Sequence, residues 1–325
     1  MTTPRPAPRP LARPLATLAL LAPSVVGPLA CAPAAARDAD TGALARPLGV
    51  VTGFHAPESV RYDPERDVYY VSNIYLYGSE KDGNGFIAEL DAADPRRGRI
   101  LAQGGRAGVT LHAPKGMALT GDTLWTADID VLRGFHRVTG QPLATLDFSA
   151  HRPTLLNDVA VGPDGTLRVT DTGIVMSRAG IIADTTGDRV FRVGPGGAIS
   201  AIPAGPPHPK PNGITWDARG GRWLVVTFGR YLSRLYALDD RTGARTPLAE
   251  GMGQWDGVEA LADGRILVTS WSDSSVHLLD GDRDTRIVRH LDQPADLGVD
   301  TRRHRILVPA AGANRLELWS LPARR

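Results

Sequence analysis

The feature that most constrains the fold is a unit that occurs six times along the chain. Each copy has a polar start, a short alternating strand pattern, a turn, and a second strand rich in β-branched residues, as in "LLNDVAVGPDGTLRVTDTG" from Leu155. Strand units repeated every 40 to 50 residues or so are typical of a β-propeller. The corresponding positions of the six units are Glu58, Lys115, Asn157, Asn212, Asp256 and Ala295. The repeat therefore predicts an all-β, six-bladed β-propeller.

The segments between the units complete the blades. Residues 86–102, 134–148, 189–203 and 233–251 each have the pattern of a further strand pair, and no segment shows a capped helical period. The last unit has only three strands, ending in "RLELWSL", whereas "RPLGVVTGF" precedes the first unit without a partner. We therefore predict one domain over residues 45–325, in which the N-terminal strand closes the last blade.

The first 36 residues differ from the rest of the chain. Arg5, Arg9 and Arg13 precede the apolar run "LATLALLAPSVVGPLA", and small residues follow, which is the order of a secretory signal. The run is short and contains prolines, so a membrane-spanning helix is the weaker interpretation. Cys31 follows "PLA", which resembles a bacterial lipobox. We predict a periplasmic or secreted protein, either cleaved near this cysteine or anchored to a membrane only through a lipid on Cys31.

Composition excludes several classes of function. Without the three signal arginines, 34 basic residues stand against 35 acidic ones, so the apparent basicity belongs to the signal. A nucleic-acid partner usually needs a concentrated basic face, and we expect none here. Cys31 is the only cysteine, so the folded body has no disulfide, thiolate metal site or cysteine nucleophile. The absence of a Gly-x-Ser-x-Gly motif argues against a serine hydrolase.

The polar starts of the units predict a metal site. In a propeller the first strand of each blade lines the central channel, so the six corresponding positions should form a ring at one height. Two carboxylates and two amides in such a ring suit a hard cation such as Ca²⁺, although another divalent cation would also fit. The alternative is that these residues only bind water in a wet channel. The predicted metal ligands are Glu58, Asn157, Asn212 and Asp256.

Two long loops lie on the same face as the ring. The segments "NIYLYGSEKDGNG" and "TGIVMSRAGIIADTTGD" follow the second strands of the first and third units. Because functional loops collect around a site, we expect these loops to border it. The alternative is that they are tolerated surface insertions.

The tripeptides "PES", "LND", "PNG" and "WDG" resemble the Glu, Asn, Asn and Asp metal positions of the calcium-dependent propeller hydrolases, which include gluconolactonase, regucalcin, the paraoxonases and diisopropylfluorophosphatase. The resemblance covers nearly the whole mature chain. It implies hydrolysis of a small-molecule lactone or ester, with the metal polarising the carbonyl and water activated by Asp256 or a nearby base. The alternative is a non-catalytic propeller that binds a ligand or protein around a structural calcium ion. A strictosidine-synthase-like condensing enzyme is disfavoured, because that group lacks this metal set.

One ring position departs from the family pattern. In paraoxonases a histidine occupies a position like that of Lys115, so a histidine relay does not carry over to this residue. The chain has only three lysines, which indicates that Lys115 is either a catalytic residue or the partner of Glu58 in an ion pair. His55 and His112, each in a "HAP" near the channel mouth, are alternative candidates for an acid or base.

Three further residues have two interpretations each. Asp171, at the end of the hairpin that contains Asn157, is either a support for the metal site or a turn residue. Trp255 and Trp271 either line a pocket or pack in the core.

Overall fold

The computed structural model describes residues 44–75, 79–177, 180–184, 188–203 and 210–324. All of them belong to one compact unit, Thr41–Arg325. The predicted signal segment and Cys31 lie outside the described residues, so export and lipidation stay predictions. Within the described ranges, no helix has the length and apolar character needed to cross a membrane.

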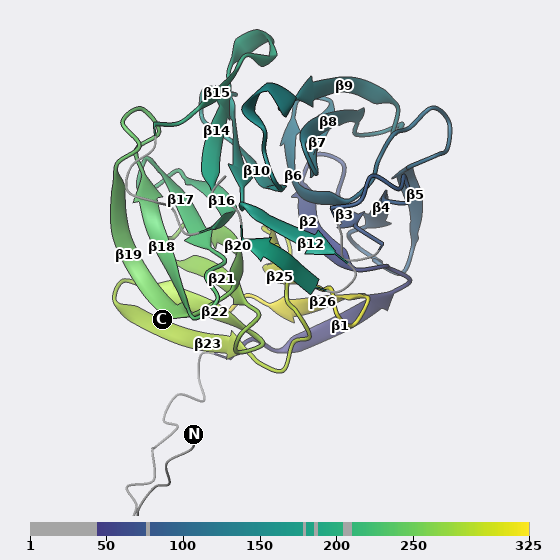
Figure 1. The fold of residues 1–325 in the computed structure, drawn as a ribbon. Helices are drawn as coiled ribbons and strands as arrows, with labels where there is room; N and C mark the ends of the chain where they lie inside the picture. Colours follow the sequence, from purple (N-terminus) through teal and green to yellow (C-terminus); the bar gives the residue numbers. More distant parts are fainter. Residues whose placement is uncertain (1–43, 76–78, 178–179, 185–187, 204–209, 325) are drawn as a thin grey trace, which may run out of the picture. The chain divides into compact units, whose positions relative to one another are not determined.

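Six four-stranded antiparallel sheets stand in a ring, which confirms the predicted six-bladed propeller (Figure 1). In the first three blades the strands run, from the innermost outward, as follows. Blade 1 contains β2 (Pro57–Asp63), β3 (Val68–Asn73), β4 (Phe86–Asp91) and β5 (Gly98–Gln103). Blade 2 contains β6 (Pro114–Thr120), β7 (Thr123–Asp128), β8 (Val131–His136) and β9 (Pro142–Asp147). Blade 3 contains β10 (Leu156–Val161), β11 (Leu167–Asp171), β14 (Arg189–Val193) and β15 (Ile199–Ala201).

The other three blades have the same order. Blade 4 contains β16 (Pro211–Asp217), β17 (Arg222–Thr227), β18 (Leu232–Leu238) and β19 (Arg245–Met252). Blade 5 contains β20 (Trp255–Ala260), β21 (Ile266–Ser270), β22 (Ser275–Asp280) and β23 (Arg283–Val288). Blade 6 contains β24 (Gly298–Asp300), β25 (Arg305–Ala310), β26 (Arg315–Ser320) and β1 (Pro47–Thr52).

A separate hairpin, β12 (Ile174–Ser177) and β13 (Gly180–Asp184), is inserted between the second and third strands of blade 3. The only helical elements among the described residues are two short 3₁₀ turns, Ser149–His151 and Pro195–Gly197. The chain therefore has the all-β composition that the sequence pattern predicts.

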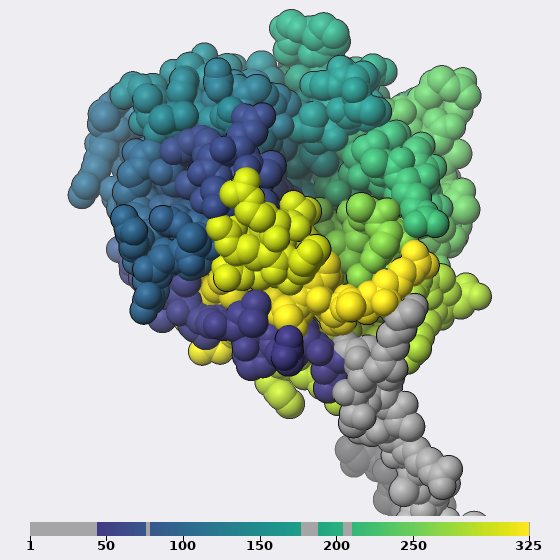
Figure 2. All heavy atoms as spheres, turned by 180° about the vertical axis from the view of Figure 1, so that it is seen from behind, coloured from purple at the N-terminus to yellow at the C-terminus, as the bar shows by residue number. Residues whose placement is uncertain are grey.

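The N-terminal strand closes the ring, as predicted. β1 pairs antiparallel with β26, so that Val50 lies opposite Glu317 and Val51 lies opposite Leu316. Figure 2 shows the N-terminal segment in purple beside the C-terminal strands in yellow. This pairing covers the backbone edge that β26 would otherwise expose.

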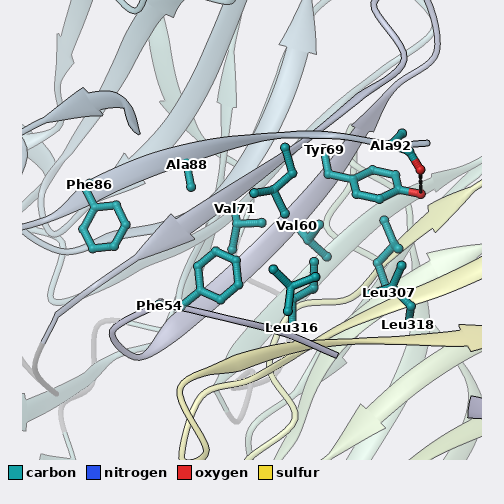
Figure 3. Close-up of a cluster of buried hydrophobic side chains, with 12 residues drawn as sticks. Phe54, Val60, Tyr69, Val71, Phe86, Ala88, Ala92, Leu307, Leu316 and Leu318 are labelled. Carbon is teal, nitrogen blue, oxygen red and sulfur yellow. Dashed lines mark hydrogen bonds between the residues drawn. The ribbon is translucent and has the colours of Figure 1, made fainter. Parts of the chain in front are cut away.

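The hydrophobic core lies between the blades. At the closure point, Phe54 and Val60 pack with Leu316 and Leu318 of β26 in one buried cluster (Figure 3). The hydroxyl of Tyr69 in the same cluster also donates a hydrogen bond of 2.5 Å to Asp300 Oδ2 in blade 6. The junction thus combines apolar burial with a hydrogen bond between blades.

Candidate functional site

A shift in strand register recurs in the innermost strands. In β2 the pairing with β3 shifts between Pro57 and Val60, and the same shift occurs at the equivalent place in β6, β10, β16 and β20. The ring residue and the residue after it lie inside each shift. Because a β-bulge bends a strand and redirects side chains, each of these strands can turn two successive residues toward the channel.

The first of these two residues forms an upper ring. All six corresponding positions are buried and line one enclosed cavity. The structure therefore brings together the whole set that the repeat predicts: Glu58, Lys115, Asn157, Asn212, Asp256 and Ala295. The cavity has a volume of about 30 Å³, which is room for an ion or about two water molecules.

Three oxygen atoms in this ring are buried without a hydrogen-bond partner among the described residues. They are Glu58 Oε2, Asn212 Oδ1 and Asp256 Oδ1. A buried polar atom without a partner is costly, and a bound cation would satisfy all three atoms together. In the described ranges no three His, Cys, Asp or Glu side chains converge as metal ligands, so a metal here would depend on the two Asn amides. Such a mixed oxygen set fits Ca²⁺ and does not fit zinc.

Charge is crowded in the ring. Burial raises the pKa of the Glu58 carboxyl well above its ordinary value, and the negative charges of Asp256 and Asp296 raise it further. Burial and the charge of Asp296 likewise raise the pKa of Asp256. Burial lowers the pKa of the Lys115 ammonium, although Glu58 acts in the opposite direction. A divalent cation between the two ring carboxylates would offset this repulsion.

The residues that follow the ring positions form, together with Arg61, a lower layer that sequence reasoning missed. Arg61 of blade 1 lies across the channel, with Nη2 at 2.8 Å from Asp296 Oδ2 and 3.3 Å from Asp158 Oδ1 of blade 3. Ser59 Oγ donates a 2.6 Å hydrogen bond to the same Asp296 oxygen. Burial opposes the charge on Arg61, but Asp296 and Asp158 raise its pKa. The lower layer is thus a buried ion network directly under the ring.

Glycines make room for this network. Gly116 and Gly257 directly follow the ring residues of blades 2 and 5. A Cβ atom at Gly116 would lie 2.1 Å from Asp158 Oδ1, and one at Gly257 would lie 2.7 Å from Asp296 Cα. The repeated Gly or Asp after the ring position was therefore the sequence signal for the lower layer.

Carboxylates at the ends of second strands hold the loops that lead to the ring. Asp171 Oδ1 accepts a 2.9 Å hydrogen bond from the Leu155 amide, two residues before Asn157. Asp128 Oδ1 accepts a 2.8 Å bond from the Ala113 amide at the equivalent place in blade 2. The geometry therefore favours the interpretation that Asp171 positions the segment that carries Asn157, over that of a simple turn residue.

The two loop histidines do not line the ring cavity. The amide of Gly83 donates a 2.9 Å hydrogen bond to His112 Nδ1. The His55 ring packs on Tyr75, with the ring centroids 4.7 Å apart. Neither histidine side chain is part of the cavity lining. An acid or base role for His55 or His112 therefore stays a prediction.

The surroundings of Lys115, Trp255 and Trp271 distinguish between the two interpretations of each residue. Lys115 Nζ donates a 3.1 Å hydrogen bond to the Ala113 carbonyl, and no carboxylate oxygen of the described residues lies within 4.0 Å of it. The ion pair with Glu58 is therefore not formed. Trp271 lines the cavity, whereas Trp255 is fully buried in the core between blades 4 and 5.

The two long loops meet on the ring face, as expected. Ile174 and Met176 of β12 line the cavity, and the β12–β13 hairpin lies across the centre of the ring of blades in Figure 1. The amide of Ser79, in the blade 1 loop, donates a 2.8 Å hydrogen bond to the Met176 carbonyl. The cavity is therefore roofed by segments of blades 1 and 3 that are joined by a hydrogen bond.

These features define a six-bladed propeller whose central cavity brings together two carboxylates, two amides and a lysine. No protein-family profile and no curated protein sequence matches the chain. Solved structures do match. A gluconolactonase of Xanthomonas campestris is 16% identical with a TM-score of 0.65, covering 88% of this chain and 96% of that one.

Two other matches come from different kinds of protein. A luciferin-regenerating enzyme is 13% identical with a TM-score of 0.62, over 85% of this chain and 95% of the other. A chain from a nidogen–laminin complex is 18% identical with a TM-score of 0.55, over 72% and 82%. At such identities the likeness concerns the fold, and for the fold the predicted resemblance to gluconolactonase-like propellers is confirmed.

The lower layer leads to a stability prediction. Replacing Arg61 by Leu is expected to lower the free energy of unfolding by about 3 to 5 kcal/mol, because it leaves buried carboxylates without their counter-charge. Adding Asp296→Asn to this variant should restore part of the loss, since it removes one of those charges. Urea denaturation at neutral pH measures both effects.

The matched control is Arg96→Leu, which removes an exposed arginine whose ion pair with Asp94 lies on the surface. This change should barely move the unfolding midpoint. An Arg61→Leu variant as stable as this control would show that the buried network contributes nothing.

Proposed function

We propose that this chain is an exported, metal-dependent hydrolase of lactones or related esters. Glu58, Asn157, Asn212 and Asp256 would hold a Ca²⁺ ion in the channel. The observation that carries the proposal is the set of three orphaned oxygen atoms on the ring, since nothing else among the described residues satisfies them. The fold shared with a gluconolactonase supports the choice of reaction.

The chemistry divides among few residues. A bound divalent cation would supply Lewis acidity toward the carbonyl of the scissile bond. The Asp256 carboxylate would accept a proton from the attacking water, and the Lys115 ammonium would face the negative charge that develops on the carbonyl oxygen. The roof would exclude bulk water, which strengthens each of these electrostatic interactions.

A second candidate function is a propeller that binds a partner and uses the cation only as structure. It is favoured by the match to a chain from a nidogen–laminin complex, because that structure has the same fold within a protein–protein assembly. Fold alone does not separate the two candidates. Turnover that depends on metal does.

The test is a screen of the purified protein without its first 36 residues against aldonolactones, aliphatic lactones and aryl esters. The hydrolase proposal expects turnover of at least one class, abolished by chelator and restored by added Ca²⁺. A protein that gains thermal stability from Ca²⁺ but hydrolyses none of these compounds would instead support the binding propeller.

A further inference from the structure

A second ring of equivalent residues lies beside the oxygen ring. The residue that directly follows the second strand is apolar in five of the six blades. In blade order these residues are Ile74, Ile129, Thr172, Phe228, Trp271 and Ala311. A pattern repeated from blade to blade at one position indicates a shared role, since each blade contributes to one common cavity.

Four members of this apolar ring line the cavity itself: Ile74, Phe228, Trp271 and Ala311. In blade 3 the Thr172 hydroxyl instead donates a 2.9 Å hydrogen bond to the Pro211 carbonyl, away from the cavity. Two side chains of β12, Ile174 and Met176, take its place. Above the six ring positions, every described lining residue is therefore hydrophobic, and the one N–H donor that these side chains carry is the buried indole Nε1 of Trp271.

The apolar roof is well packed. The rings of Phe228 and Trp271 meet edge to face, with centroids 5.3 Å apart and an interplanar angle of 86°. Leu155 and Ile174 pack with Phe228 in one buried cluster, against which Met176 and Trp271 also pack. Aromatic pairs in this geometry make favourable contacts, so the closed roof presents an ordered, largely apolar surface to the cavity.

We propose that the substrate is a lactone or ester with an alkyl or aryl body and not a polyhydroxylated sugar lactone. This inference rests on the proposed function and specifies its substrate class. The reactive carbonyl would face the oxygen ring, and the apolar body would contact the roof. Sugar hydroxyls would be buried against Phe228, Trp271 and Met176, where the Trp271 indole N–H is the one side-chain N–H donor. Most of the hydroxyls would stay unpaired, and a site selects strongly against such groups.

The size of the cavity adds a condition. A volume of about 30 Å³ is too small for a lactone ring, so substrate must displace part of the roof. The hydrogen bond from the Ser79 amide to the Met176 carbonyl joins the blade 1 loop to the β12–β13 hairpin and is the link such a movement would break. The apolar side chains of β12 would then close over the body of the substrate, where longer alkyl groups gain more from burial.

The first experiment needs no variant. We expect kcat/KM of the Ca²⁺-loaded protein to rise by about fourfold for each methylene added to the side chain of a γ-lactone, until the roof is filled. Glucono-δ-lactone should be at least about 100-fold poorer than the best alkyl lactone. A preference for glucono-δ-lactone, or no dependence on chain length, would overturn the inference while leaving the hydrolase proposal intact.

The second experiment changes the roof. Phe228→Asn places a polar group there, and Phe228→Leu is the matched control that keeps it apolar. The Asn variant should lose at least about tenfold in kcat/KM for a long-chain γ-lactone relative to unsubstituted γ-butyrolactone, with the Leu variant close to the parent protein. An equal loss for both lactones would show that Phe228 serves only the fold, and would count against the inference.

A binding measurement separates the two proposals. Lactams resist hydrolysis under the assay conditions and so serve as unreactive probes. One probe has an alkyl chain and the other has sugar hydroxyls, and the rise in melting temperature that each produces reports its affinity. If no lactone or ester is turned over, the hydrolase proposal fails. A rise in melting temperature with the alkyl lactam would still support an apolar ligand site, whereas a rise only with the hydroxylated lactam would reject it.

Discussion

Replacing Asp256 by Ala is expected to abolish hydrolysis and the rise in melting temperature that Ca²⁺ produces. Asp256 supplies one of the two carboxylates of the ring, and its Oδ1 atom is buried without a partner among the described residues. Exported proteins meet abundant Ca²⁺, so a site with a Kd near 10⁻⁴ M would be largely filled. At a Ca²⁺ concentration 100 times Kd, binding to the folded state adds about 2.7 kcal/mol of stability, which this variant would lose.

Thermal melts with Ca²⁺ and with chelator, together with kcat/KM, measure the effect. The matched control is Asp217→Ala. Asp217 lies at the end of β16 remote from the ring residue Asn212, and its carboxylate accepts a 2.9 Å hydrogen bond from the Gly220 amide. This control should lower stability but keep both the Ca²⁺ response and turnover. A normal Ca²⁺ response in the Asp256→Ala protein would remove Asp256 from the site.

The fold was predictable because its information is repeated. Each blade needs the same alternating first strand, turn and β-branched second strand, so six imperfect copies define one architecture. The closure was also predictable, because a blade with three strands leaves an open edge that only the unpaired strand around Val50 was placed to cover. Alignment of the units likewise placed Glu58 and Asp256 at one height, and the structure does bring them to one cavity.

The lower layer was not predictable by the same reasoning. Strict alternation allows one channel-facing residue at each level of a strand, so by that pattern alone Asp158 and Asp296 would point away from the channel. The register shift at the ring positions of blades 1 to 5 changes that count. In the structure both carboxylates contact Arg61, which lies in a different blade from either of them. A bulge of this kind depends on local backbone geometry that the hydrophobic pattern does not encode.

The apolar ring as a set was missed for a different reason, although the sequence analysis did consider one member, Trp271, as a pocket-lining residue. Phe228 and Trp271 each follow a buried strand directly, so in the sequence they look like the last residues of that strand. Only the end of the strand pairing at Thr227 and Ser270 shows that they belong to the channel mouth. Strand ends are the least certain part of a sequence-based assignment, and here they contain the residues that contact the body of the proposed substrate.

Replacing Lys115 by Met is expected to lower kcat by about 100-fold or more while Ca²⁺ affinity is kept or improved. Met preserves length and packing but removes the charge. Lys115 Nζ is buried and donates one hydrogen bond, to the Ala113 carbonyl, and no carboxylate of the described residues lies within ion-pair distance. Burying a lysine amine without a carboxylate in ion-pair contact is costly for the fold, so a lysine at this position indicates a role toward the ligand.

The control is Lys81→Met, which removes a half-exposed ammonium that forms an ion pair of 2.6 Å with Asp130. That variant should keep normal turnover. Steady-state kinetics, calcium titration and thermal melts separate two roles of Lys115. A large fall in kcat with an unchanged melting temperature assigns Lys115 to stabilisation of the transition state. Calcium affinity should not fall in this variant, because an ammonium repels the cation. Near-normal turnover with lower stability would mean that the buried charge serves only the packing of blade 2.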